Sequence, residues 1–336
     1  MNSKVLLVGG CGFIGHNLAI YLKNNKINPI VVDSLSINNL KSFEFKKNNG
    51  DKSNQLYRAI LNNRIKLLYE NNIELIEQDT RFDNEIFDIY NKINPDIVIH
   101  LAAVSHANKS NKDPHTTFDN SIRTLENTLE YVRKNKKHLI YISSSMTYGN
   151  FDSKEVNEDT ICNPLGIYGT LKYCGELIVK SYSEVFDFPF TIIRPSALYG
   201  ERCVSRRVTQ VFIENALTNK EITIMGNGEE KLDFTYINDL MQGIYSCINN
   251  NNSINQIFNL TYGNARKIND LIDILREYFP NIKIKNLPRD KLMPERGTLD
   301  ISKAKKLLSY NPKFSLDNGF RKYIEWYIDF YKNLNN

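Results

Sequence analysis

The amino-acid sequence predicts an α/β protein with a doubly wound parallel sheet and a smaller C-terminal α/β substrate lobe. Strand-like and helix-like patterns alternate to about residue 195, as in a parallel sheet with helices on both faces. A glycine-rich turn follows the first apolar run, and Tyr168 stands four residues before Lys172. We expect one domain over 1–195 and a second over 196–336, and we allow for a return of segments near 235–262 to the first domain.

The first predicted element is a buried strand over residues 5–8, which are apolar and partly β-branched. Gly9, Gly12 and Gly15 follow, and helical apolar spacing begins at His16. Glycines allow a tight turn and let backbone N–H groups approach a pyrophosphate at the helix N-terminus. The sequence therefore predicts a Rossmann-type dinucleotide site, with a loop formed by Gly9, Gly12, Phe13, Ile14 and Gly15.

The second predicted strand, residues 30–32, ends in Asp33. A carboxylate at this point accepts hydrogen bonds from the adenosine ribose hydroxyls and repels a 2′-phosphate. No Arg or Lys lies between Asp33 and Leu40. The sequence therefore favours NAD over NADP as the cofactor.

Tyr168 and Lys172 form the candidate acid/base pair. Residues four apart share one face of a helix, so the ammonium of Lys172 can lie near the phenol of Tyr168. A tyrosine with an ordinary pKa of about 10 is a poor base at neutral pH. A neighbouring cation stabilises the phenolate and makes proton transfer easier.

Several motifs, taken in order, resemble those of the extended short-chain dehydrogenase/reductases, in the branch of nucleotide-sugar epimerases and dehydratases. The matching segments are the G-x-x-G-x-x-G turn and residues 100–103, 143–149, 194–200 and 232–240. The resemblance is closest to the nucleotide-sugar 4-epimerases. It implies an NAD-dependent, cytoplasmic enzyme of nucleotide-sugar metabolism and polysaccharide biosynthesis that forms a homodimer.

The resemblance also implies roles for individual residues. Ser144 takes the family's catalytic Ser/Thr position and would hydrogen-bond the reacting sugar hydroxyl. Further cofactor contacts are implied for Asp79, Thr80, Leu101, Ala102, Ala103, Asn120 and Pro195, together with Tyr168 and Lys172. Substrate contacts are implied for Ser105, Ser145, Met146, Arg207, Lys231 and Arg296.

The two residues after Ser144 distinguish the reactions that this family performs. Its 4,6-dehydratases carry an acidic pair there, and its decarboxylating members keep an acid at the second position. Ser145 and Met146 cannot transfer a proton as a carboxyl group does. What remains needs only hydride transfer and one phenol. A 4-epimerase fits this, because it oxidises C4 to a 4-keto sugar, lets the sugar rotate and returns hydride to the other face. The alternatives are a C4 dehydrogenase or 4-keto-sugar reductase and, further off, a 3- or 5-epimerase or a non-catalytic NAD sensor.

Two positions depart from the family pattern. Leu232 stands where the family has an arginine that pairs with the diphosphate, and Ala197 stands where an Asn or Thr is usual. Arg206, Arg207 and Arg296 lie near other diphosphate-contacting positions, and arginine binds phosphate through bidentate donors. We expect a nucleotide-diphosphate sugar as the substrate, either an unusual sugar or one held in a shifted pose.

Composition excludes several other classes. The net charge of +5 is spread along the chain, and no arginine-rich stretch interleaved with aromatic residues predicts nucleic-acid binding. No apolar run reaches the roughly 18 residues that span a bilayer, and no signal peptide precedes the first strand. The five cysteines lack C-x-x-C spacing, which favours a reducing compartment and argues against a metal site.

Residues 41–72 form a longer connection than usual between two strands. A polar loop over 46–52 and a helix over 55–69 are expected there, either as a surface elaboration or as a contact near the substrate. In the C-terminal lobe we expect helices over 208–217 and 269–278, strands over 222–225 and 282–284, and a loop over 249–252.

Overall fold

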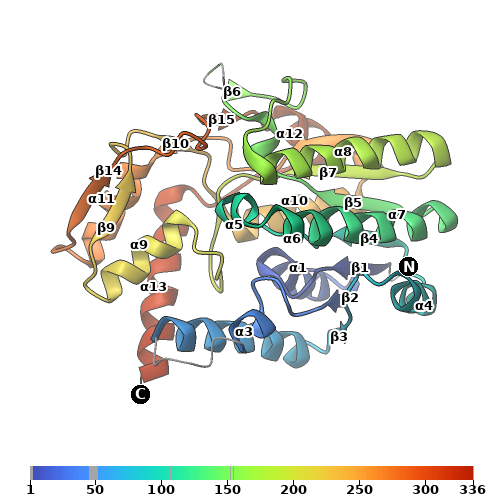
Figure 1. The fold of residues 1–336 in the computed structure, drawn as a ribbon, viewed down its shortest axis with the longest axis horizontal. Coiled ribbons are helices and arrows are strands. Elements are labelled where there is room, and N and C mark those ends of the chain that lie inside the picture. Colours follow the sequence, from blue (N-terminus) through green and yellow to red (C-terminus); the bar gives the residue numbers. More distant parts are fainter. Residues whose placement is uncertain (1–2, 45–51, 106, 152, 154, 336) are drawn as a thin grey trace.

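The computed structural model describes residues 3–44, 52–105, 107–151, 153 and 155–335. In this part of the chain a central sheet has seven parallel strands in the order β12-β7-β5-β4-β1-β2-β3 (Figure 1). The strands are β1 (Lys4–Val8), β2 (Asn28–Asp33), β3 (Glu74–Glu77), β4 (Ile97–His100), β5 (His138–Ile142), β7 (Phe190–Arg194) and β12 (Gln256–Asn259). The predicted doubly wound parallel sheet is confirmed.

Both faces of the sheet are covered by helices, which explains why the inner strands β1, β4, β5 and β7 are buried over most of their length. Val5 and Leu7 of β1 face one core cluster, which also contains residues of α1 (Phe13–Asn24) and α10 (Ile237–Asn249). Leu6 and Val8 face a second cluster with α4 (Asp83–Ile93), α7 (Thr124–Asn135) and α8 (Gly166–Phe186). This alternation is the period of two expected of a strand.

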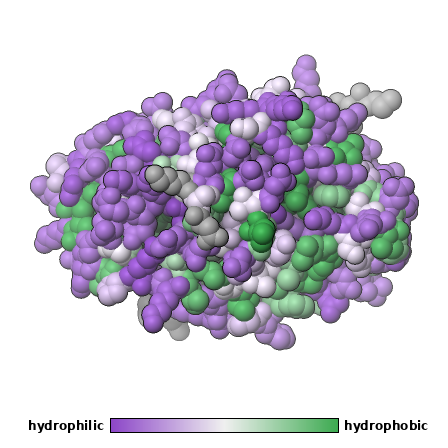
Figure 2. All heavy atoms as spheres, turned by 90° about the horizontal axis from the view of Figure 1, so that it is seen from above, coloured by the Kyte–Doolittle hydropathy of each residue, from purple (hydrophilic) through white to green (hydrophobic). Residues whose placement is uncertain are grey.

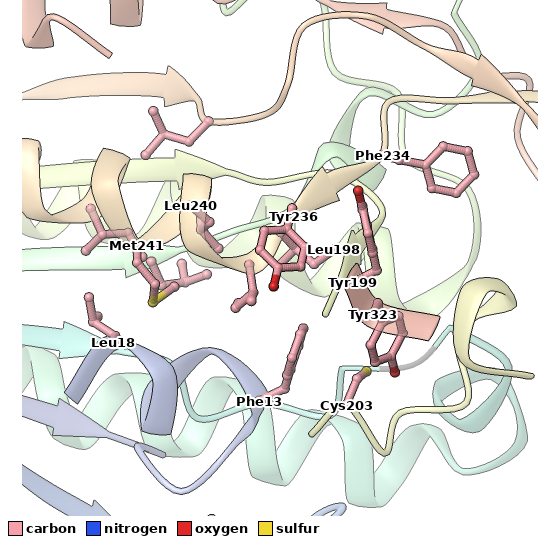
Figure 3. Close-up of a cluster of buried hydrophobic side chains, with 14 of the residues drawn as sticks. Phe13, Leu18, Leu198, Tyr199, Cys203, Phe234, Tyr236, Leu240, Met241 and Tyr323 are labelled. Atoms are coloured by element: carbon pink, nitrogen blue, oxygen red, sulfur yellow. The ribbon is translucent and has the colours of Figure 1, made fainter. Parts of the chain in front are cut away.

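The C-terminal lobe is built around the parallel pair β9 (Ile222–Met225) and β14 (Ile284–Leu287). Its main helices are α9 (Val208–Leu217), α11 (Ile268–Tyr278) and α13 (Leu316–Asn335). The first core cluster continues from the sheet into this lobe. Figure 3 shows part of it, where Phe13 of α1 lies in the same cluster as Leu240 and Met241 of α10 and Tyr323 of α13.

The chain returns to the central sheet within the segment 235–262. Strand β12 pairs in parallel with β7, for example Ile257 beside Ile192 and Phe258 beside Ile193. The division into domains at 195 remains a prediction, but β12 and the shared core join the two parts closely.

Most predicted elements of the lobe lie where the sequence indicated. Helix α9 and strand β9 have the expected bounds, and α11 begins one residue earlier than expected. The strand expected over 282–284 is wrong in position, because β14 spans Ile284–Leu287. The N–H of Ile282 bonds to the carbonyl of Phe279 in the turn that ends α11, and pairing starts at Ile284, opposite Ile222.

The connection 41–72 contains α2 (Leu40–Glu44) and α3 (Lys52–Glu70), and α3 is longer than the expected helix over 55–69. Positions 46–51 of the expected polar loop lie outside the described residues.

The loop expected over 249–252 is wrong in part, because α10 extends to Asn249 and a 3-10 turn, η3, covers Asn251–Ser253. Shorter elements are α5 (Ala107–Lys112), α6 (Pro114–Phe118), η1 (Asp119–Arg123), η2 (Ser145–Tyr148), β6 (Glu155–Val156), β8 (Leu198–Tyr199), β10 (Lys231–Leu232), β11 (Thr235–Tyr236), β13 (Arg266–Lys267), β15 (Thr298–Leu299) and α12 (Ser302–Leu308).

The surface is largely polar on the face that Figure 2 shows, where apolar residues gather only in smaller areas. Among the described helices, none is long and apolar enough to cross a membrane.

Candidate functional site

The glycine loop packs tightly between β1 and α1, at the carboxyl end of the sheet. Gly9 has a φ of +78°, and a Cβ atom there would lie 2.7 Å from the backbone of Ala102. A Cβ atom on Gly15 would lie 2.5 Å from the backbone of Gly10. Both positions therefore need glycine, which leaves the start of α1 open to a ligand.

Asp33 ends β2 beside this loop, and its side chain is 9% exposed. One carboxylate oxygen accepts a hydrogen bond from the N–H of Cys11 at 2.9 Å and the other accepts from the N–H of Leu35 at 2.7 Å. Burial raises the pKa of Asp33, although these two hydrogen bonds oppose the rise. Each oxygen keeps a lone pair for a ligand hydroxyl.

The predicted cofactor residues meet in one cleft at this edge of the sheet. Twelve of them line it: Gly9, Gly12, Phe13, Ile14, Gly15, Asp33, Asp79, Thr80, Leu101, Ala102, Ala103 and Asn120. Glycines that leave no room for side chains, a helix N-terminus and a carboxylate fit a dinucleotide. Tyr168, Lys172 and Pro195 are not among the cleft's lining residues. Pro195 directly follows β7, and its carbonyl accepts a hydrogen bond from the N–H of Ser145.

Asp79 follows β3 at the rim of the cleft. It accepts hydrogen bonds from the guanidinium of Arg81, with the closest contact at 2.7 Å, and Arg81 also reaches Asp119. Partial burial alone would raise the pKa of Asp79, but the hydrogen bonds from Arg81 outweigh it and lower the pKa. Asp79 is therefore held as a carboxylate at the cleft predicted for the cofactor.

Helix α8 carries the predicted acid/base pair. A Cβ atom on Gly169 would lie 2.7 Å from the carbonyl oxygen of Met146, so glycine lets α8 pack directly on the η2 turn. The ammonium of Lys172 is buried, donates to the carbonyl of Ile142 at 2.7 Å and lies 5.0 Å from the ring centre of Tyr141. Burial lowers the pKa of Lys172 to about 8.

Ser144 begins the η2 turn at the end of β5. Its hydroxyl oxygen accepts a hydrogen bond from the N–H of Met146 at 3.2 Å, which fixes the side chain. The hydroxyl proton can still be donated to a ligand. The close packing of α8 on this turn brings the predicted catalytic residues Ser144, Tyr168 and Lys172 to one end of the sheet.

A buried ion pair that the sequence analysis missed lies behind these side chains. Glu176 of α8 accepts hydrogen bonds from Arg194 of β7 at 2.9 and 2.6 Å and from the hydroxyl of Ser143. The side chains of the ion pair are 1% and 3% exposed. The sequence carried a signal for it, because Tyr168, Lys172 and Glu176 are spaced four apart on one helix face.

A second cavity, of about 1050 Å³, lies between α8 and the C-terminal lobe. It is lined by the predicted residues Ser105, Met146, Tyr168, Arg207, Lys231 and Arg296, and by Ala197 and Leu232. Ser105 and Arg207 also line the dinucleotide cleft, so they lie where the two cavities meet. Asn111 and Arg289 line it too and were not predicted.

Arg296 lines the cavity and also contacts the two residues that follow Ser144. It donates to the hydroxyl of Ser145 at 2.6 Å and contacts the sulfur of Met146 at 3.0 Å. Burial lowers the pKa of Arg296 to about 10. Ser145 is 3% exposed and is not among the residues that line the cavity, so its predicted contact with the substrate remains a prediction. A cation thus contacts the two positions where dehydratases of the family carry acids.

The fold and the cleft define a dinucleotide-binding enzyme of the Rossmann type. The chain belongs to the NAD dependent epimerase/dehydratase family, whose model matches residues 5–261. The family resemblance seen in the sequence is therefore confirmed, and NAD is the cofactor of this family.

Relatives named as epimerases and relatives named as dehydratases are both similar to this chain. A Methanocaldococcus jannaschii protein, provisionally named UDP-glucose 4-epimerase, is 29% identical in sequence. The match covers 96% of this chain and 97% of that protein. A dTDP-D-glucose 4,6-dehydratase of Dictyostelium discoideum is 31% identical over 76% of this chain and 58% of its own length. The fold is also similar to the crystal structure of UDP-glucuronic acid 4-epimerase from Bacillus cereus in complex with UDP-glucuronic acid and NAD. The TM-score is 0.86 and the sequence identity is 27%, over 97% of this chain and 99% of that chain.

Proposed function

We propose that this chain is an NAD-dependent nucleotide-sugar 4-epimerase. One observation carries the proposal. The cavity contains a tyrosine, Tyr168, one helical turn from a buried lysine, while Ser145 and Met146 stand where dehydration would need carboxyl groups. Hydride transfer with a single proton-transferring phenol is sufficient for epimerisation at C4. It is not sufficient for expelling the C6 hydroxyl.

The chain's own residues would bind the cofactor and move one proton. The glycine loop would hold the pyrophosphate and Asp33 the adenosine ribose. Bound NAD supplies a hydride acceptor and returns the hydride. Tyr168 would take the proton from the C4 hydroxyl and give it back, Lys172 would stabilise the phenolate, and Ser144 would orient the sugar hydroxyl through a hydrogen bond.

The substrate would be a nucleotide-diphosphate sugar. Arg207 and Lys231 line the cavity together with Arg296, and guanidinium groups suit a diphosphate because they donate two parallel hydrogen bonds. The similarity to UDP-sugar epimerases supports this substrate class. The homodimer, the cytoplasmic location and the role in polysaccharide biosynthesis remain predictions.

The reaction can be tested by incubating the protein with UDP-, GDP- and dTDP-sugars in deuterated buffer and analysing the products by mass spectrometry and NMR. We expect a product of unchanged mass with inverted C4. Loss of water or carbon dioxide would contradict the proposal, and a change of two hydrogens would favour the C4 dehydrogenase or reductase. Solvent deuterium at C3 or C5 would indicate a 3- or 5-epimerase. The Tyr168→Phe variant is the matched control.

A further inference from the structure

Helix α3, in the long connection between β2 and β3, contacts both halves of the site. Its buried side chain Arg64 is 1% exposed and lines the dinucleotide cleft. Among the described residues, the guanidinium hydrogen-bonds to two backbone carbonyl groups. Nη1 donates to Cys11 at 3.4 Å, while Nε, at 3.0 Å, and Nη2 donate to Arg202.

The contact with Cys11 fixes the glycine loop from a second side. The N–H of Cys11 is held by Asp33, and its carbonyl is held by Arg64 and by Asn39, each at 3.4 Å. The peptide groups that would cradle a pyrophosphate are therefore positioned by α3 as well as by β2. Burying a guanidinium is costly unless it is hydrogen-bonded in this way.

The contact with Arg202 reaches the substrate side. Arg202 belongs to the β8–α9 loop, residues 200–207. Its carbonyl accepts two hydrogen bonds from Arg64, and its own guanidinium donates to Asn63 of α3 at 2.7 Å. Arg202 has a φ of +66°, which a non-glycine residue adopts only when its surroundings hold it there.

A second chain of hydrogen bonds joins α3 to the far end of the same loop. The hydroxyl of Tyr57 donates to Glu214 of α9 at 2.6 Å. Glu214 accepts from Gln210 at 2.7 Å, and the side-chain oxygen of Gln210 accepts from the N–H of Arg206 at 2.9 Å. Helix α3 therefore holds the β8–α9 loop at both ends.

Several residues of this loop line the site, and Arg207 is the one that lines both cavities. Its Nε is buried with no hydrogen-bond partner among the described residues. A buried, unpaired donor of this kind favours an anionic ligand. Its position depends on the two ends of the loop, which α3 contacts through Arg202 and through Glu214; Tyr327 of α13 also donates to Glu214, at 2.6 Å.

We propose that Tyr57, Asn63 and Arg64 of α3 are positioning residues that couple cofactor occupancy to nucleoside-diphosphate binding. Ordering of the glycine loop by NAD is transmitted through Arg64 to Arg202, and the loop then presents Arg207 to the diphosphate. The inference rests on the proposed function, because it assumes that NAD and a nucleotide sugar occupy these cavities. Binding free energies coupled in this way are reciprocal.

The test measures the rate of NAD loss from the holoenzyme, with and without saturating UDP, GDP or dTDP. In the native chain we expect at least one of these nucleotides to slow NAD release by about five-fold or more. In Arg64→Gln the ratio should fall towards one. Tyr57→Phe keeps the buried ring and loses only the hydrogen bond to Glu214, so its ratio should also fall while its melting temperature stays close to native. Arg58→Gln, on an exposed position of the same helix, should keep the native ratio.

The outcomes separate this inference from the proposed function. A native chain that retains no NAD and converts no nucleotide sugar contradicts the proposed function. If NAD is retained and sugars are epimerised, the inference is overturned by native ratios in both Arg64→Gln and Tyr57→Phe. A native ratio of one with all three nucleotides overturns it as well. A merely structural role for α3 would lower the melting temperature and leave the ratio unchanged.

Discussion

Replacement of Glu176 by Gln removes the negative charge from the buried ion pair beneath the candidate catalytic side chains. Arg194 would then remain buried, at 3% exposure, without its carboxylate. Removing one partner of such a pair costs about 3–5 kcal/mol, because the other charge stays uncompensated. Glutamine keeps the shape and one acceptor oxygen, so we expect the lower end, about 3 kcal/mol of unfolding free energy. That is a large share of the roughly 5–15 kcal/mol that stabilises a typical protein.

Urea unfolding at neutral pH, followed by the fluorescence of Trp326, measures this loss. Trp326 is the only tryptophan in the sequence and packs on α13 against Phe330, with ring centres 4.9 Å apart. The matched control is Glu130→Gln, whose partner Arg133 lies one turn away on α7 at partly exposed positions. That pair should contribute less than about 1 kcal/mol. Equal losses in the two variants, or a loss below about 1 kcal/mol for Glu176→Gln, would refute the reasoning.

Three further results are expected. Tyr168→Phe should lower turnover by at least about 10²-fold, the usual contribution of a proton-transferring group, while NAD stays bound; near-native turnover would remove Tyr168 from the mechanism. Asp33→Ala should weaken NAD binding and relax discrimination against NADP, and an unchanged dissociation constant for NAD would show that Asp33 does not reach the ribose. The kcat should fall as pH rises through about 8, because burial lowers the pKa of Lys172 to that value and a neutral amine no longer stabilises the phenolate. A kcat that keeps rising beyond that pH would contradict this role.

The sequence predicted those features that depend on neighbouring residues. Apolar, β-branched runs such as residues 5–8 indicated strands buried on both faces. The glycine-rich turn over residues 9–15 indicated the dinucleotide cleft, and the spacing of Tyr168 and Lys172 indicated a shared helix face. In each case the chemistry follows from residues a few positions apart, so local periodicity was sufficient.

Contacts between distant residues were not predictable in this way. Arg64 and Arg202 are separated by 138 positions, and Ser145 and Arg296 by 151. Nothing in the local pattern around Arg64 distinguishes it from an exposed arginine of an amphipathic helix. The shift of β14 has the same origin, because its start is set by pairing with β9 rather than by its own apolar residues.

The position of β12 at the edge of the central sheet has a consequence for synthesis of the chain. Strand β7 is complete at Arg194, but its neighbour β12 arrives about 60 residues later. At a translation rate of about 5–20 residues per second, this delay lasts about 3–12 seconds. Throughout it, β7 presents unpaired N–H and C=O groups along one side, and unpaired strand edges are where chains associate wrongly. A nascent chain at this stage therefore offers the edge of β7 for wrong pairing, whereas in the finished sheet β12 occupies that side and is itself the edge strand.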